Sequence, residues 1–278
     1  VGPIGARAQP ASTASATSSA IRITDDRGQH LVLTRPAQRV ISLLPSLTEA
    51  LCDLGACARL VGVDRYANWP ASVQRLPRLG GLDDTPLERV LELRPDLVVL
   101  AGSARLLPRL QALGVPVLAL EPRSLAQTQV VYAKLSLALG LGAAHEAAWA
   151  RLQARIDTAA QHVPASMRGR RVYFEVSTEP YAAGAASFTG EVLTRLGLVN
   201  IVPADLGPYP RLNPEFIVQA QPDVIVIAPA QAQALRSRPG WSRVPAVASG
   251  RICAPSVEAM DTLVRPGPRL GEGALAIA

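Results

Sequence analysis

Two stretches of the chain, LERVLELRPDLVVLA at 87–101 and PEFIVQAQPDVIVIA at 214–228, are near copies of each other and decide the fold. Each begins with a segment of helical spacing, continues through a Pro-Asp turn and ends in an apolar strand. Such strands are common in α/β proteins and can recur by chance. Chance does not readily account for two copies with the same order of helix, turn and strand and with matching glutamates, Glu88 and Glu215. The sequence therefore predicts one helix–turn–strand unit that is built twice.

Around the first copy, short apolar strands alternate with helices. A hairpin is predicted at the DDRG turn, 25–28, because apolar and polar residues alternate on both sides of it. The segments RVISLL, RLVGVD, DLVVLA and VPVLAL follow as strands with helical segments between them. This β-α alternation is typical of a parallel sheet covered by helices.

The middle of the chain carries no strand signal between Ser124 and His162. Apolar residues recur there at helical spacing, and Gly140 and Gly142 interrupt the pattern, so two helices are predicted. The second spans about 143–162, and twenty helical residues extend roughly 30 Å. A long helix is therefore expected to separate two β/α halves.

After this helix the first pattern returns, with strands at RVYFEVS, DVIVIA and RICAPS and a helix at EVLTRLG. We therefore predict an α/β fold with two β/α lobes, parallel sheets and one long backbone helix. The predicted parts are a mobile Ala/Ser/Thr/Pro-rich tail (1–20), an N-terminal lobe (21–123), linking helices that include the backbone helix (124–169) and a C-terminal lobe (170–278). The tail suits an exported protein after signal removal.

Composition and missing motifs exclude several functions. The chain has 278 residues and a net charge of +6, but its basic residues are spread out and aromatics make up only 4%, which disfavours nucleic-acid binding. No phosphate-binding glycine loop and no nucleophile elbow occurs. The three histidines lie far apart without ligand spacing, so no metal site is expected. Cys52 and Cys57 either pair in an oxidising compartment or stay as buried free thiols.

Two facing parallel sheets leave a cleft at the carboxyl ends of their strands, and the loops there hold the candidate site residues. These loops combine aromatic side chains with one acidic and one basic residue, a set that suits a bulky, partly apolar ligand with a polar edge. The alternative is that the aromatics only cap the core. The residues are Tyr66, Trp69, Tyr181, Tyr209, Asp261 and Arg265.

The stretch from RVISLLPSLTEALCDLGA to LERVLELRPDLVVLA, together with the Tyr-x-x-x-Pro loop and RPGPR, resembles the helical-backbone class of ABC-importer substrate-binding proteins. Within that class it is most similar to the cobalamin-binding branch, over about 38–275. The resemblance implies a periplasmic, monomeric protein that captures a corrinoid, with no resident cofactor and no catalysis. The rivals are a ferric siderophore or haem carrier of the same class and a chelatase-like enzyme.

The resemblance also assigns roles to individual residues. It implies that three tyrosines, Tyr66, Tyr181 and Tyr209, line the cleft while Asp261 and Arg265 contact the polar edge of the corrinoid. Leu82 and Tyr209 stand where the vitamin-binding members have tryptophan, which reduces stacking surface, and Trp69 is expected to compensate.

Glu88 and Glu215 take matching places in the two lobes. The resemblance implies that they dock onto arginine pockets of the two permease subunits of the importer, where complementary charge speeds encounter and fixes register. The alternative is two solvated glutamates at helix starts, favoured by the helix dipole.

Overall fold

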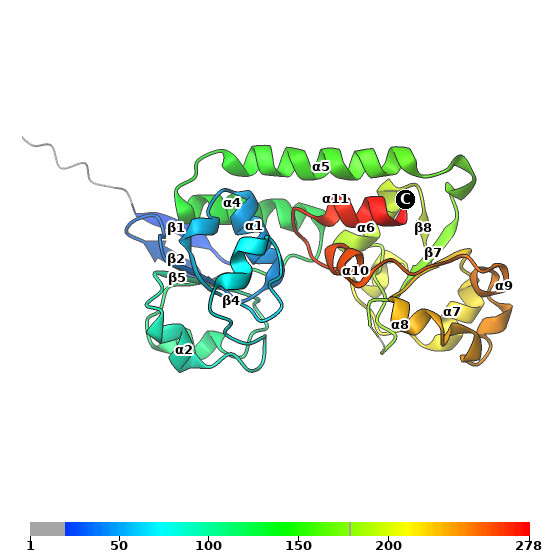
Figure 1. Cartoon of the computed structure of the whole chain (residues 1–278), viewed down its shortest axis with the longest axis horizontal. Helices are drawn as coiled ribbons and strands as arrows, with labels where there is room; N and C mark the ends of the chain where they lie inside the picture. Colours follow the sequence, from blue (N-terminus) through cyan, green and yellow to red (C-terminus); the bar gives the residue numbers. More distant parts are fainter. Residues whose placement is uncertain (1–19, 178) are drawn as a thin grey trace, which may run out of the picture.

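The computed structural model of the chain describes residues 20–177 and 179–278, so the predicted tail lies outside the described residues except for Ala20. Two lobes stand side by side, and one long helix, α5 (Ala144–His162), runs along the same edge of both (Figure 1). The predicted α/β class with two parallel-sheet lobes and a long backbone helix is confirmed.

The N-terminal lobe begins with an antiparallel hairpin and continues as a helix-covered parallel sheet. Its sheet has the strand order β4-β3-β5-β6. The elements are β1 (Ile21–Thr24), β2 (His30–Leu33), β3 (Val40–Ser42), α1 (Pro45–Asp53), η1 (Cys57–Arg59), β4 (Leu60–Val63), η2 (Ala71–Arg75), α2 (Leu87–Glu92), β5 (Leu97–Leu100), α3 (Leu107–Ala112), β6 (Val117–Ala119) and α4 (Leu125–Leu139).

The C-terminal lobe repeats this plan with the sheet order β10-β9-β7-β8, again all parallel. The sequence did not indicate β8, because two residues are too short to show a period. The elements are η3 (Ala165–Met167), β7 (Arg171–Phe174), α6 (Phe188–Arg195), β8 (Val199–Asn200), η4 (Ala204–Leu206), α7 (Pro214–Ala220), β9 (Val224–Val226), α8 (Pro229–Ala232), η5 (Leu235–Ser237), η6 (Trp241–Arg243), α9 (Pro245–Ser249), β10 (Ile252–Cys253), α10 (Val257–Leu263) and α11 (Leu270–Ile277).

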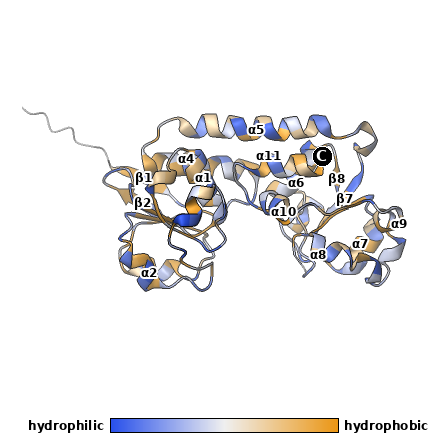
Figure 2. Cartoon of the chain, viewed as in Figure 1, coloured by the Kyte–Doolittle hydropathy of each residue, from blue (hydrophilic) through white to orange (hydrophobic). Residues whose placement is uncertain are grey.

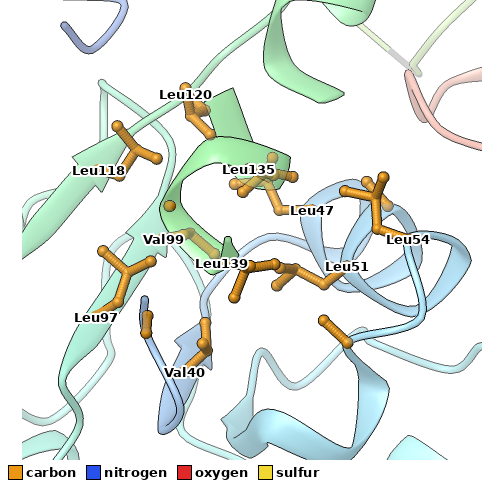
Figure 3. Close-up of a cluster of buried hydrophobic side chains, with 14 of the residues drawn as sticks. Val40, Leu47, Leu51, Leu54, Leu97, Val99, Leu118, Leu120, Leu135 and Leu139 are labelled. Atoms are coloured by element: carbon orange, nitrogen blue, oxygen red, sulfur yellow. The ribbon is translucent and has the colours of Figure 1, made fainter. Parts of the chain in front are cut away.

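Apolar side chains cover both faces of the N-terminal sheet, which is why its strands read as unbroken apolar runs. In β5, Leu97 and Val99 point toward α1 and α4, where Leu51 and Leu135 meet them (Figure 3). Val98 joins the opposite cluster, against α2 and α3. In both lobes the strands are mostly apolar, whereas the helices carry apolar and polar residues side by side (Figure 2).

The helices between the sheets divide their contacts between the lobes. The middle of α4 packs into the N-terminal core through Val131 and Leu135. The long helix α5 places Ala148 in the N-terminal core and Leu152 and Ile156 in the C-terminal core, and α11 packs along it. Because α5 belongs to both cores, it fixes the distance between the lobes.

The sequence repeat has the same backbone conformation in both lobes. Arg94 and Gln221, which precede the repeated Pro-Asp, are the two non-glycine residues with positive φ in the described chain, at 46° and 49°. The carboxylate of Asp96 accepts the backbone N–H of Arg39 at 2.8 Å, and that of Asp223 accepts the N–H of Arg171 at 2.9 Å. Each Pro-Asp turn therefore ties the incoming strand to its central neighbour.

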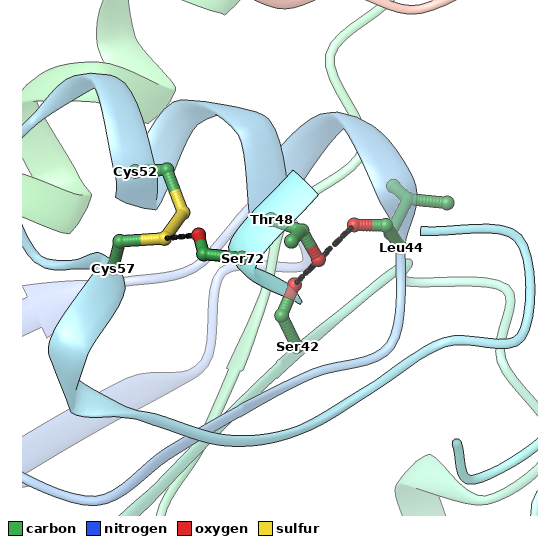
Figure 4. The surroundings of a disulfide bond; sticks show 6 residues. All are labelled: Ser42, Leu44, Thr48, Cys52, Cys57 and Ser72. Atoms are coloured by element: carbon green, nitrogen blue, oxygen red, sulfur yellow. Dashed lines mark hydrogen bonds between the residues drawn. A yellow bond between two sulfur atoms is a disulfide. The ribbon is translucent and has the colours of Figure 1, made fainter. Parts of the chain in front are cut away.

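The two cysteines whose pairing the sequence left open form a disulfide. Cys52 at the end of α1 is bonded to Cys57 in η1, and Ser72 lies beside the Cys57 sulfur (Figure 4). The bridge closes the turn at the end of the helix. A disulfide of this kind persists in an oxidising compartment.

Candidate ligand-binding cleft

The carboxyl ends of the N-terminal strands open onto three cavities that share lining residues. One cavity, of about 450 Å³, lies at the ends of β3 and β4 and includes Leu44 and Pro45. A second, of about 160 Å³, contains the same two residues together with Glu121 and residues of the other lobe. The third, of about 570 Å³, also includes Glu121 and lies at the ends of β5 and β6. Together they form a trough, and we call the first cavity its aromatic end and the third its polar end.

The aromatic end contains two of the predicted residues. Tyr66 is 62% exposed and Leu82 is 41% exposed, and both line the cavity. The loop that carries Tyr66 is held by Asp64, which accepts the N–H of Tyr66 at 2.6 Å, and by the ion pair between Arg65 and Asp84. Burial raises the pKa of Asp64 above its usual range. An exposed ring on a loop fixed at its base can stack against a flat ligand.

The middle of the trough is where the lobes meet. Arg265 follows α10 and donates to Glu49 of α1 at 3.0 Å and to the side-chain oxygen of Asn68 at 2.7 Å. It also pairs with Asp261 at 2.7 Å, so the predicted i, i+4 pair is present. These contacts hold Arg265 at the boundary between the lobes, where it lines the middle cavity, whereas Asp261 lines none of the three cavities.

Glu49 was not singled out from the sequence, although it is the buried partner of this contact. It is 1% exposed, and its Oε2 atom has no hydrogen-bond partner in the described chain. Burial raises the pKa of Glu49, and the neighbouring Arg265 only partly opposes that effect. The carboxylate is thus held at the lobe boundary by one guanidinium.

Trp69 lies against the other lobe. The guanidinium of Arg269 is 5.6 Å from the centre of the Trp69 ring, and Arg269 also pairs with Glu258 and Glu272. Trp69 lines none of the cavities described here. The ring therefore contributes to the contact between the lobes, and its part in ligand binding stays a prediction.

Tyr181 and Tyr209 come from the C-terminal lobe and also line none of these cavities. Tyr181 is 38% exposed, on the loop that pairs with Arg211. Tyr209 packs edge-on against Phe188 with ring centres 5.9 Å apart, and its hydroxyl is buried. Burial raises the pKa of Tyr209 well above its usual range. Only Tyr66 of the three tyrosines is brought to the trough in this structure.

The polar end was missed by the sequence reasoning. Glu121 and Arg123 come directly after a predicted strand, and this position at a carboxyl strand end is the signal that would have found them. Arg27 reaches the same cavity from the hairpin turn between β1 and β2. The hairpin was predicted, but its contact with the sheet edge depends on tertiary packing.

Glu88 and Glu215 lie near the starts of α2 and α7, on the side of the molecule opposite to α5 (Figure 1). Both are exposed. Glu215 borders a further cavity of about 690 Å³, which lies within the C-terminal lobe and includes Val218, Pro239 and Trp241. That cavity is separate from the trough, because the two have no lining residue in common.

Residues 20–177 and 179–278 contain no cluster of three or more potential metal ligands, and no helix among them has the length and apolarity of a membrane span.

Comparisons with known proteins agree with this architecture. Residues 40–254 match the model of the periplasmic binding protein family. The chain is 30% identical to the vitamin B12-binding protein of Yersinia pestis over 73% of this chain and 74% of that protein.

Two solved structures are similar over most of their length. The periplasmic haem-binding protein RhuT of Roseiflexus is 28% identical, with a TM-score of 0.72 over 86% of this chain and 95% of that one. The periplasmic vitamin B12-binding protein BtuF of Vibrio cholerae is 25% identical, with a TM-score of 0.68 over 87% and 95%.

Members of this family bind a ligand that is transported rather than converted, so the expectation of a non-enzymatic protein without a resident cofactor is confirmed. The match over most of the chain, the two lobes and the backbone helix lead to one conclusion: the chain belongs to the periplasmic binding protein family, as a substrate-binding protein of the ABC-importer type with a helical backbone.

Proposed function

We propose that this protein captures cobalamin or a related corrinoid in the trough between its lobes and delivers it, in the periplasm, to an ABC importer. The observation that carries the proposal is the trough itself, with the exposed Tyr66 ring and Leu82 at one end and polar groups at the other. A corrinoid is a large macrocycle with an apolar face and amide edges, which such a surface suits.

The trough also bears on the choice between corrinoid and haem. A haem carrier supplies an axial Tyr or His to the iron, whereas a corrinoid brings its own axial base. None of the three histidines, His30, His145 and His162, lines a cavity of the trough, so Tyr66 is the candidate axial ligand for haem. Among the relatives, vitamin B12-binding and haem-binding proteins both occur, and a direct comparison of ligands is needed.

The experiment is a titration of the purified chain with cyanocobalamin, haem and ferric siderophores, followed by calorimetry. We expect saturable one-to-one binding of cyanocobalamin that weakens about tenfold in Tyr66→Ala, since stacking on an aromatic ring contributes about 0.5–1.5 kcal/mol in addition to the area that it buries. Val257→Ala, at an exposed apolar site outside the trough, is the matched control. Tight binding of haem with no response to cyanocobalamin overturns the corrinoid assignment.

For delivery we propose that Glu88 and Glu215 contact the two permease subunits. Their positions near the starts of corresponding helices, on the face opposite to α5, support a partner with approximate two-fold symmetry. Exposed carboxylates at such places steer and orient a positively charged partner surface.

A further inference from the structure

The polar end of the trough carries charges that the proposed function has not used. Asp26, Arg27, Glu121 and Arg123 line this cavity of about 570 Å³, with Gly102 and Ser103 at the end of β5. Because Glu121 also lines the cavity where the lobes meet, the polar end is continuous with the ligand trough.

The two carboxylates in this cavity already have partners. Asp26 pairs with Lys134 at 2.6 Å, and its other oxygen accepts the N–H of Glu121 at 2.8 Å. Glu121 in turn accepts the N–H of Ser103 at 3.0 Å. Both acidic groups therefore serve to hold the hairpin and the strand ends together.

The two arginines, in contrast, are exposed and have no carboxylate within ion-pair distance in the described part of the chain. Lys134 balances Asp26, so Arg27 and Arg123 are left as the two guanidinium groups of the lining without an ion-pair partner among the described residues. Gly102 leaves room beside them, since a side chain at that position would contact Arg27 and Glu121 at 3.4 and 3.5 Å.

We propose that the polar end is an anion subsite, in which Arg27 and Arg123 bind a phosphate or carboxylate group carried by the ligand whose macrocycle lies at the aromatic end. Guanidinium groups bind such oxyanions through paired, charge-assisted hydrogen bonds. The inference rests on the proposed function for the identity of the ligand. In a corrinoid the group is the phosphodiester of the nucleotide loop, and in haem it is a propionate.

The test compares ligands with and without the anionic group on the wild type and on the double variant Arg27→Gln, Arg123→Gln. Cyanocobalamin is paired with dicyanocobinamide, which lacks the phosphodiester, and haem is paired with its dimethyl ester. Within the pair that binds, we expect the double variant to lose at least tenfold in affinity for the ligand that carries the phosphodiester or propionate and less than twofold for the ligand that lacks it. Whichever pair shows this difference identifies the source of the anion.

Arg236→Gln, Arg243→Gln is the matched control, because both arginines are exposed and lie away from the trough. It removes the same charge, so equal losses in both double variants would mean a long-range effect of net charge and would overturn the subsite. Unchanged affinity in Arg27→Gln, Arg123→Gln overturns it as well.

A readout without a macrocycle separates this inference from the proposed function. Pyrophosphate titrated into the ¹⁵N-labelled wild type is expected to shift the amide signals of Gly102 and Ser103 saturably. Gly102→Leu is expected to abolish the shift of the Ser103 signal by filling the cavity. If no macrocycle binds but pyrophosphate shifts the amide signals as expected, the proposed ligand class is wrong and the anion subsite stands. The absence of any pyrophosphate shift removes the subsite even if a corrinoid binds.

Discussion

The parallel sheet of the N-terminal lobe starts with β3. Its second strand, β4, lies at one edge next to β3, and β5 and β6 follow on the other side of β3. The C-terminal lobe has the same order, with β7 and β9 in the places of β3 and β5. The left-handed residue before each Pro-Asp turn, at Arg94 and Gln221, also occurs in both. The shared features hold each sheet together.

The lobes differ in their charged groups. Each buries a glutamate, but Glu175 pairs with Arg238 of its own lobe whereas Glu49 pairs with Arg265 of the other lobe. The trough cavities are lined mainly by the N-terminal lobe, and the cavity of about 690 Å³ that Glu215 borders lies in the C-terminal one. The comparison shows that the repeated elements build the scaffold, while the buried ion pairs and the cavities come from side chains that do not repeat.

The buried glutamates give the largest expected effect. Glu175 has a fully buried side chain. Among the described residues, Arg238→Ala leaves its carboxylate with one side-chain partner, the Tyr173 hydroxyl at 3.2 Å. We expect this variant to lose about 3–5 kcal/mol in the free energy of unfolding, measured by urea denaturation. Arg265→Ala is expected to lose about 2 kcal/mol or less, because a small separation of the lobes lets water reach Glu49.

Hydrogen exchange checks the reason for this difference. Arg265→Ala should speed amide exchange in α1 without affecting the C-terminal sheet, and the exposed Arg236→Ala should do neither. Equal losses of stability in the two variants, with α1 exchange unchanged, would contradict a contact between lobes.

The pKa of Glu49 sets the pH dependence of the Arg265→Ala loss. Burial raises this pKa in the folded protein, and removing Arg265 raises it further, so the folded variant binds more protons than the unfolded chain above the ordinary carboxyl pKa of about 4.3. The free energy of unfolding of the variant therefore rises as the pH falls from neutral toward about 4.3. We expect the difference from wild type to shrink toward pH 4.

The repeated aspartates should differ by a smaller amount. Asp96 accepts the backbone N–H groups of Gln38 and Arg39, at 2.9 and 2.8 Å. Among the described residues, Asp223 accepts one backbone N–H, that of Arg171, and its carboxylate lies 3.7 Å from the guanidinium of Arg170. We expect Asp96→Ala to cost about 2 kcal/mol of unfolding free energy and Asp223→Ala about 1 kcal/mol.

Urea denaturation of the two alanine variants measures this difference, with the asparagine variants as controls, since an amide oxygen keeps one acceptor. Equal costs at both positions would mean that the extra hydrogen bond of Asp96 contributes nothing.

Much of the scaffold was predictable because it depends on local signals. The long helix was placed within one residue of its observed start and at its observed end, His162, because Gly142 and Pro164 frame it. The apolar runs of β5 and β9 were recognisable because parallel strands are buried on both faces.

The site was less predictable because it depends on contacts between distant segments. Tyr66 and Leu82 lie together because two loops of one lobe meet, but the Glu49–Arg265 contact joins segments 216 positions apart. Nothing local to Glu49 indicates that partner. Tyr209 was chosen for its loop position and for the resemblance, and its packing against Phe188 depends on the C-terminal core, so its contact with a ligand stays a prediction.

The two proposed docking glutamates give the smallest expected difference and test whether the repeat has a function at the surface. Glu88 lies 3.9 Å from Arg109, which offsets part of its charge, whereas Glu215 has no cation within ion-pair distance in residues 20–177 and 179–278. Glu215 also borders an apolar cavity that an apolar side chain of a partner can enter.

We therefore expect Glu215→Arg to weaken binding to the purified importer about tenfold, or about 1.4 kcal/mol, and Glu88→Arg about threefold. Glu146→Arg, an equal change on α5 on the opposite side of the molecule, should have no effect, and ligand affinity should stay unchanged in all three. If Glu215→Arg and Glu88→Arg weaken the complex equally, the importer recognises only the repeated carboxylates. If neither does, the paired glutamates serve their own helix starts, and the importer recognises another surface of the lobes.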